Sequence, residues 1–243
     1  MRKLILFSTL IILTVGCKKQ SSTPSPKYNP EHGRLIATHY IRNQFVRETL
    51  LYTYDASARL SVTRYAGNSS TNYCTYTTNQ VTSVAGSFTL SAGNAIILMF
   101  YNPEYRMNVW DTYQYDGDGY LVGELDTIPD YYGMEASYKY LNNNCISATK
   151  IYNFSYQAGY TMISYFVYST ALNTIGNYNN GIYYLGKDNV NLPSARFDVQ
   201  NGDTSGRTYY TYEFNNDSTV HICYTAYTQA GNTQHDTDIF TYY

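Results

Sequence analysis

Polar and apolar positions alternate with a period of two along most of the chain from Arg34 onward. Leu50, Tyr52 and Tyr54 are typical, because residues two apart in an extended strand point to the same face. Residues 96–100 are apolar at every position, which predicts a central strand. No window shows a convincing 3.6-residue period, so the pattern predicts an all-β chain.

One short pattern recurs and predicts β-hairpins. In its best copy, Tyr113 and Tyr115 are followed by Asp116, Gly119 and Leu121. The two aromatics share one strand face, and the aspartate can open a type I turn by accepting hydrogen bonds from backbone amides two or three residues on. The glycine closes the turn where a positive φ is needed, and the leucine begins the return strand.

Three other copies of this pattern vary at the glycine position. They start at Tyr52, Tyr138 and Tyr212. The position is occupied by Ala58 in the first, Asn144 in the second and Ser218 in the third. Asparagine tolerates a left-handed conformation, whereas alanine there costs about 1 kcal/mol. The Ala58 turn is therefore expected to be strained or of another type. The spacing between copies is irregular, which favours a hairpin array over a strict solenoid.

We predict one all-β domain over residues 34–243, built as an antiparallel meander sheet of about ten or more strands. The alternative is a closed barrel or a sandwich, because both hide the edge strands. The least regular stretch covers residues 171–194, and a short strand is predicted there at residues 182–185.

The first 17 residues predict a lipoprotein signal peptide. Two basic residues precede an apolar run that is too short to span a membrane as a mature helix. Thr14-Val15-Gly16-Cys17 resembles a lipobox, in which signal peptidase II cuts before a cysteine that is then diacylated. Leucine is usual where Thr14 stands. The alternative is an ordinary secretory signal with a chance cysteine at Cys17.

Residues 18–33 are polar and rich in serine and proline, which predicts a disordered tether. Lipid on Cys17 would then hold the domain to a membrane. We expect this membrane to be the outer membrane, and the residues after Cys17 leave open which of its faces carries the domain.

The repeat pattern is similar to the YD repeat of RHS-type proteins. A lipid-anchored signal joined to a few such hairpins resembles small Gram-negative envelope lipoproteins of unknown function. A Gly-Lys pair at residues 186–187 followed by Asn-Leu-Pro at residues 191–193 adds to this resemblance, which spans roughly residues 35–243. It implies an antiparallel meander and no known chemistry.

The chain has 31 tyrosines and one tryptophan. One interpretation is an exposed aromatic face that stacks on sugar rings or other flat apolar surfaces. The other is structural, because tyrosine suits a sheet with half-hydrated faces. The candidates for ligand binding are the tyrosines outside the repeat and near irregular segments: Tyr131, Tyr132, Tyr178, Tyr183 and Tyr184.

Charge argues against nucleic acid as a partner. Removing the signal takes two of the 16 basic residues, which leaves 14 against 18 acidic residues and a formal charge of −4. There is no basic patch to bind phosphates.

Two acidic motifs are better explained by turns than by catalysis or metal binding. Residues 116–119 resemble the start of an EF-hand loop, but its fifth and twelfth positions are Tyr120 and Thr127. His235, Asp236 and Asp238 could form a base with its orienting carboxylate or part of a metal site. The turn signal before them favours solvated loop residues.

Cys74, Cys145 and Cys223 remain once Cys17 is acylated, so at most one internal disulfide can form. We interpret them as small buried hydrophobes. No metal and no cofactor is predicted. The function predicted is a non-enzymatic binding or scaffold lipoprotein of the envelope, with a glycan or an envelope protein as partner. The alternative is a carbohydrate-binding surface lipoprotein, and an envelope hydrolase using His235 is the least favoured.

Overall fold

The computed structural model describes residues 34–42, 45–67, 71–84, 86–102, 107–128, 132–177 and 179–242. The signal peptide, Cys17 and the predicted tether lie outside the described residues. The described residues therefore all lie within the domain predicted over residues 34–243.

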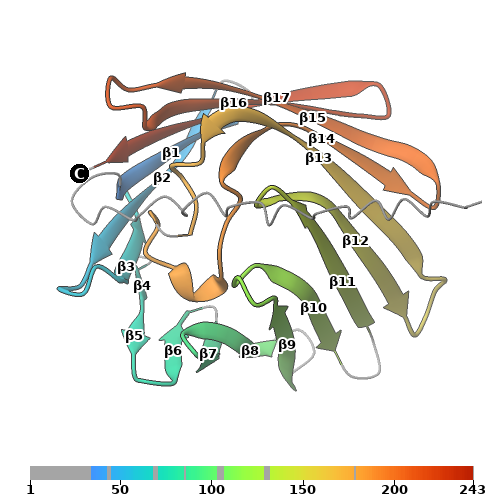
Figure 1. Cartoon of the computed structure of the whole chain (residues 1–243), viewed down its shortest axis with the longest axis horizontal. Helices are drawn as coiled ribbons and strands as arrows, with labels where there is room; N and C mark the ends of the chain where they lie inside the picture. The colour runs from blue at the N-terminus through green and yellow to red at the C-terminus, as the bar shows by residue number, and fades with distance from the viewer. Residues whose placement is uncertain are drawn as a thin grey trace, which may run out of the picture.

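The described residues form one 17-stranded sheet in which the paired strands are antiparallel (Figure 1). The elements are β1 (Leu35–Arg42), β2 (Phe45–Tyr54), β3 (Leu60–Tyr65), β4 (Thr71–Tyr73), β5 (Thr75–Tyr76), β6 (Gln80–Ser83), β7 (Gly86–Ser91), β8 (Asn94–Asn102), β9 (Met107–Tyr115), β10 (Leu121–Ile128), β11 (Tyr132–Leu141), β12 (Asn144–Phe154), β13 (Tyr160–Leu172), the 3₁₀ helix η1 (Tyr183–Leu185), β14 (Asn191–Gln200), β15 (Asp203–Phe214), β16 (Val220–Gln229) and β17 (Asn232–Tyr242). The all-β antiparallel meander predicted from the sequence is confirmed.

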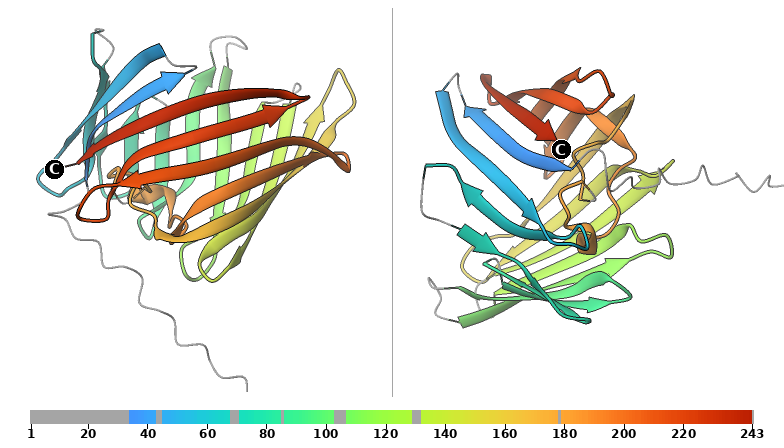
Figure 2. Two further views of the ribbon diagram at one scale, coloured as in Figure 1. Left: turned by 90° about the horizontal axis from the view of Figure 1, so that it is seen from above. Right: turned by 90° about the vertical axis from the view of Figure 1, so that its left-hand side faces the viewer.

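The meander curls until its two ends meet. Strand β1 pairs with β2 on one side and with β17 on the other, so the first and last strands lie side by side. The wall is continuous elsewhere except at Cys74, where pairing passes from β4, bonded to β3, to β5, bonded to β6. The sheet is therefore a nearly closed barrel, which is the architecture given above as the alternative (Figure 2).

The two tyrosine-led turns that begin with an aspartate have one geometry. Asp55 accepts hydrogen bonds from the backbone amides of Ser57 and Arg59, both at 2.9 Å. Asp116 does the same for the amides of Asp118 and Tyr120. The amides used are thus two and four residues on, one further than predicted, and the two copies are otherwise alike.

The position predicted to need a left-handed backbone has one in three of the four copies. The φ angles are 67° at Ala58, 89° at Gly119 and 68° at Ser218. Ala58 therefore sits in the same turn type as Gly119 and carries the expected strain. The assignment of Asn144 to this position was wrong: the left-handed residues are Asn142 and Asn143, in a tight two-residue turn that ends where β12 begins.

The irregular stretch between β13 and β14 runs inside the barrel, and we call residues 173–190 the inner segment (Figures 1 and 2). It contains η1 where a short strand was predicted, at residues 182–185. Two turns, one at Gly181 with φ 70° and one at Gly186 with φ 88°, bracket η1. These two changes of chain direction prevent residues 182–185 from pairing as a strand. The apolar pattern of the sequence does not predict them.

All four repeat turns are bonded to the inner segment. The bonds are Leu60 N to Gly181 O (3.2 Å), Lys187 N to Gly119 O (2.9 Å), Val190 N to Asn143 O (3.2 Å) and Val220 N to Thr174 Oγ1 (2.9 Å). The chain alternates direction at each turn, so these hairpins end at the same rim of the barrel, which we call the plugged end. The repeat thus supplies docking points for one internal loop.

Two clusters of buried apolar side chains flank the inner segment within the described residues. One contains Leu35, Leu192, Val220, Cys223 and Phe240. The other contains Val81, Phe88, Ala95, Leu98 and Tyr184, the last from η1. Repeat tyrosines complete this end with backbone bonds, such as Tyr54 OH to Leu35 O at 2.8 Å and Tyr212 OH to Pro193 O at 2.9 Å. The core is therefore concentrated where the inner segment meets the wall.

The strain at Ala58 can be measured. Replacing Ala58 by glycine removes the Cβ clash of the left-handed backbone, so we expect Ala58→Gly to raise the free energy of unfolding by about 1 kcal/mol in urea denaturation. Ala56 lies in the same turn without a positive φ. Ala56→Gly is the matched control and should give no gain; equal effects of the two changes would contradict the strain.

Docking of the inner segment can be measured at Gly181. A Cβ there would lie 2.7 Å from Leu60 N and 2.7 Å from the Tyr54 ring. Gly202 also has a positive φ, but a Cβ there meets nothing within 4 Å. We expect Gly202→Ala to cost about 1 kcal/mol from backbone strain alone, and Gly181→Ala about 1–3 kcal/mol more, both read from thermal unfolding. Equal losses would mean that the packing around Gly181 is loose.

Candidate functional site

The inner face of β9–β13 carries a continuous row of side chains across five strands. Directly paired positions run from Asp111 to Asp126, then to Met134, Tyr152 and Tyr160. Because paired residues in a sheet project to the same side, these five side chains share one face. A second row beside it joins Tyr113, Glu124, Ala136, Lys150 and Met162.

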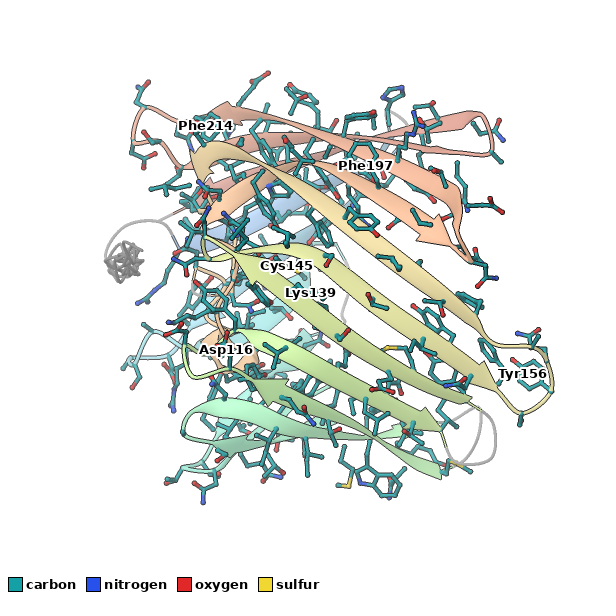
Figure 3. The ribbon with its side chains drawn as sticks, turned by 45° about the vertical axis from the view of Figure 1, so that its right-hand side comes forward. Asp116, Lys139, Cys145, Tyr156, Phe197 and Phe214 are labelled. Atoms are coloured by element: carbon teal, nitrogen blue, oxygen red, sulfur yellow. The ribbon has the colours of Figure 1, made fainter. Side chains whose placement is uncertain are left out.

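This face is the interior of the barrel. On β11, Met134 and Ala136 are buried, whereas the alternate residues Glu135, Ser137 and Lys139 are exposed. Strict alternation therefore assigns the buried set to the inside and the charged set to the outside. Figure 3 shows this wall, with Lys139 on it and with Asp116 and Tyr156 at its opposite ends.

Three acidic side chains lie together on the inner wall, and we call Asp111, Glu124 and Asp126 the carboxylate row. Burial, then the charge of Asp126, raises the pKa of Asp111 to about 7. Burial also raises the pKa of Asp126, while Lys150 opposes that rise. Glu124 accepts a 2.7 Å hydrogen bond from the hydroxyl of Tyr138. Since two adjacent carboxylates repel, Asp111 and Asp126 favour a state that holds a proton near neutral pH.

Aromatic rings gather on the same wall toward the end away from Asp116, and we call Tyr132, Tyr152, Phe154, Tyr156 and Tyr160 the aromatic patch. Ring centroids are 4.6 Å apart for Tyr152 and Tyr160, 5.5 Å for Tyr132 and Phe154, and 5.7 Å for Phe154 and Tyr156. Tyr156 is 69% exposed on the turn between β12 and β13. The other four are half-buried.

The patch and the carboxylate row are electrostatic neighbours. Burial, followed by the charge of Asp126, raises the pKa of Tyr132. Burial likewise raises the pKa of Tyr152, with smaller effects from Tyr160 and Glu124. The wall therefore presents flat rings beside hydrogen-bond acceptors.

The cations that face the interior at two other places are paired. Arg196 Nε lies 2.8 Å from Asp198 Oδ1, which also accepts a 2.6 Å bond from Ser164. Arg42 lies 2.7 Å from Asp238 Oδ1 and 3.7 Å from Asp236 Oδ2. These pairs neutralise positive charge, so they do not create a basic site for anions.

Of the five tyrosines predicted to bind a ligand, the structure describes the side chains of two. Tyr132 belongs to the aromatic patch, so a binding role for it stays a prediction. Tyr184 is 4% exposed in the apolar core beside Phe88, where it packs. Tyr131, Tyr178 and the side chain of Tyr183 lie outside what the structure describes.

The group His235, Asp236 and Asp238 lies in strand β17, so the prediction of solvated loop residues was wrong. The turn signal before it marks the turn of the β16–β17 hairpin, which lies at residues 230–231. Alternation along the strand places His235 on the exposed outer face. Asp236 and Asp238 are ion-paired to Arg42 on the other face. The imidazole and the carboxylates thus do not converge.

The three cysteines of the described residues are free thiols, buried at Cys145 and Cys223 and half-buried at Cys74. Within the same residues, no cluster of three or more His, Cys, Asp or Glu side chains suits a metal ion. Asp116 bonds to its own turn amides. The described chain also contains no helix with the length and apolar character to cross a bilayer.

The sequence interpretation missed the carboxylate row. Its signal was available: Asp111 is two residues before Tyr113, and Glu124 and Asp126 are two apart, so each pair shares a strand face. Because the tyrosines of the repeat face inward, the acids in phase with them do as well. Alternation alone does not predict the register in which β9 pairs with β10.

Two solved structures share this strand arrangement over nearly their whole length. A porin-like protein from Bacteroides vulgatus superposes with a TM-score of 0.62 and 12% sequence identity, covering 87% of this chain and 99% of that one. A porin-like protein from Bacteroides uniformis gives 0.60 and 15%, covering 86% and 98%. This chain has a porin-like fold. No protein-family model and no curated protein matches the sequence, so the likeness concerns the fold alone.

The raised pKa of Asp111 makes the stability of the porin-like barrel depend on pH. Folded, the carboxyl holds its proton up to about pH 7; unfolded, only up to about pH 4. Between these values the folded state binds more protons, so stability falls as the pH rises. Asp111→Asn removes that loss, and we expect it to be more stable than the natural protein at pH 8 by about 1–2 kcal/mol after solvent screening.

Urea unfolding at pH 4, 6 and 8 measures this difference, which should shrink toward pH 4. Asp118→Asn, at an exposed turn carboxylate, is the control and should leave the pH dependence unchanged. A gain at Asp111→Asn that is the same at every pH would contradict the shared-proton interpretation.

Proposed function

We propose that the protein is a lipid-anchored envelope protein of the outer membrane whose barrel is a non-enzymatic binding or scaffold module. In this proposal the lipid on Cys17 is the membrane attachment, and the barrel lies in water beside the membrane. The observation that carries it is the chemistry of the outer wall.

A barrel that crosses a bilayer needs an apolar outer band about 25 Å tall. A tilted strand of about ten residues spans only that height, so nearly all its outward residues would meet lipid. The outward residues of the ten-residue strand β11 are Gly133, Glu135, Ser137, Lys139 and Leu141. Glu135 lies near the middle of the strand, Ser137 follows it and Lys139 lies nearer one end, so three of the five outward residues are polar and this strand is suited to water.

Other parts of the outer wall have the same character. Arg207 and Glu213 are exposed on β15, on either side of Tyr209 and Thr211. His235 is exposed on β17. The exposed apolar side chains of Leu125 and Ile151 lie on either side of Glu135, and a mixed surface of that kind is usual for a protein in water.

The inner segment also argues against a channel. Its bonds reach the hairpins β2–β3, β9–β10, β11–β12 and β15–β16, which are spread around the rim, so the segment crosses the plugged end (Figure 1). The relatives in fold are described as porin-like, and we take from them only the barrel. A bonded loop that crosses one end, together with polar groups on the inner wall, favours binding over passage.

A non-enzymatic role is part of the proposal. The separation of His235 from Asp236 and Asp238 leaves the hydrolase alternative without its acid–base group. In this proposal the lipid attaches the protein to the membrane, and the barrel binds a glycan or an envelope protein. The resemblance to YD-like envelope lipoproteins supports this proposal.

Replacement of Cys17 tests the proposal in the full chain. We expect the natural protein to partition into the detergent phase and to incorporate radiolabelled palmitate in a Gram-negative host, whereas Cys17→Ala should do neither. Cys74→Ala, a cysteine within the wall, should behave like the natural protein. A Cys17→Ala protein that still needs detergent to stay in solution would show that the barrel itself enters the membrane.

A further inference from the structure

The aromatic patch is a ladder of rings stacked on one another. Tyr152 and Tyr160 are nearly parallel, with centroids 4.6 Å apart and planes 24° apart, and Phe154 is stacked with Tyr160 at 6.0 Å and 26°. Tyr132 adjoins both Tyr152 and Phe154. The rings therefore cover part of each other's faces and leave their edges, their hydroxyls and the outer faces of the ladder free. A ligand with more than one apolar face would contact several of these rings at once.

The patch is not covered like the core at the plugged end. Its four ring residues on strands are half-buried, whereas Tyr184 and Phe88 in the core are only 4% and 6% exposed. Tyr156 extends from the turn at the far end of the wall (Figure 3). Half-exposed rings retain free surface that a ligand can remove from water.

The polar groups beside the patch are mostly acceptors. Asp126 and Asp111 continue the row that contains Tyr152 and Tyr160, and Glu124 lies in the neighbouring row. Carboxylates accept hydrogen bonds from hydroxyl groups, and the tyrosine hydroxyls can donate or accept. A ligand with an apolar face and several hydroxyls along its edge satisfies both parts of the wall. A pyranose ring has that form: axial C–H groups on its faces and hydroxyls around it.

Charge restricts the class further. Even with a proton held by Asp111 and Asp126, the carboxylate row keeps a negative charge that repels uronates, sulfates and phosphates, and Lys150 is the one cation of the two rows described above. The mature chain is itself net negative, with 14 basic and 18 acidic residues. Polyanionic glycans and nucleic acids are therefore disfavoured, and neutral glycans are not.

We infer that the aromatic patch binds a neutral oligosaccharide, with apolar sugar faces packed against the exposed parts of Tyr152, Tyr160 and Phe154 and sugar hydroxyls donating to the carboxylate row. This inference rests on the proposed binding function and names its ligand class. Contact with the ligand removes part of each ring from water, so every ring of the patch adds to the affinity. Loss of a central ring should thus weaken binding about tenfold or more.

The test is calorimetric titration of the full-length lipoprotein in detergent micelles. The probes are maltohexaose, cellohexaose, laminarihexaose, xylohexaose and mannohexaose, with polygalacturonate as the polyanion. We expect at least one neutral hexasaccharide to bind and polygalacturonate not to. No heat with any of the five, or binding of polygalacturonate alone, would overturn the inference.

Variants locate the site. Tyr152→Ala and Tyr160→Ala should each weaken binding about tenfold or more, while Tyr152→Phe should retain most of it because stacking is kept. Tyr165 is the matched control: it is on β13 with Tyr160 but points outward and is 47% exposed. Tyr165→Ala should bind normally. Equal losses for Tyr160→Ala and Tyr165→Ala would place the ligand elsewhere and refute the assignment.

A second measurement covers the case in which an alanine variant fails to fold. Bound hexasaccharide should protect Tyr152, Tyr156 and Tyr160 of the natural protein from nitration by tetranitromethane, as mapped by mass spectrometry, and should leave Tyr165 and Tyr209 reactive. Absence of protection at the patch during saturating binding would refute the site. Because Cys17 lipidation is measured separately, failure here leaves the envelope-anchoring proposal standing.

Discussion

The hydrogen bonds between the inner segment and the four tyrosine-led turns are the constraint on which the rest of the barrel depends. Strand number and register fix the circumference of the barrel, but each ladder joins only neighbouring strands. One loop bonded at Leu60, Gly119, Asn143 and Val220 joins hairpins far apart in the sheet. The loop therefore ties distant parts of the wall together at the plugged end, and the apolar clusters on either side of it add packing there.

This arrangement explains why the four copies of the repeat differ in sequence at their turns. Each turn must present a backbone N–H or C=O group to the inner segment. This requirement restricts the backbone conformation of the turn more than it restricts which side chains the turn carries. Gly119 meets it without strain, Ala58 and Ser218 adopt the same left-handed backbone, and the third copy uses Asn142 and Asn143 in a shorter turn. The tyrosines before the turns point inward, where Tyr54 and Tyr212 donate to backbone carbonyls and Tyr138 donates to Glu124. Conformation and inward direction are therefore what the copies share.

Much of the fold could be predicted from the sequence, because period-two alternation and the Asp–Gly turns are local signals. The hairpins, the antiparallel order and the irregular stretch near residue 180 all followed from them. Closure did not, since it depends on pairing between β1 and β17, about 200 residues apart. The site was harder still: Tyr132 was identified for its place near a loop, whereas Asp111 and Asp126 become neighbours only through strand register.

The change of partner at Cys74 gives the wall a weak seam. Strands β4, β5 and β6 contain three, two and four residues, the shortest ladders in the described barrel. Short ladders open locally at less free energy than long ones, so amide hydrogens should exchange there first. Each opening would expose unpaired edges of β3 and β6, which could pair with another copy. A barrel that hides its edges thus keeps one place where oligomers or fibrils could begin.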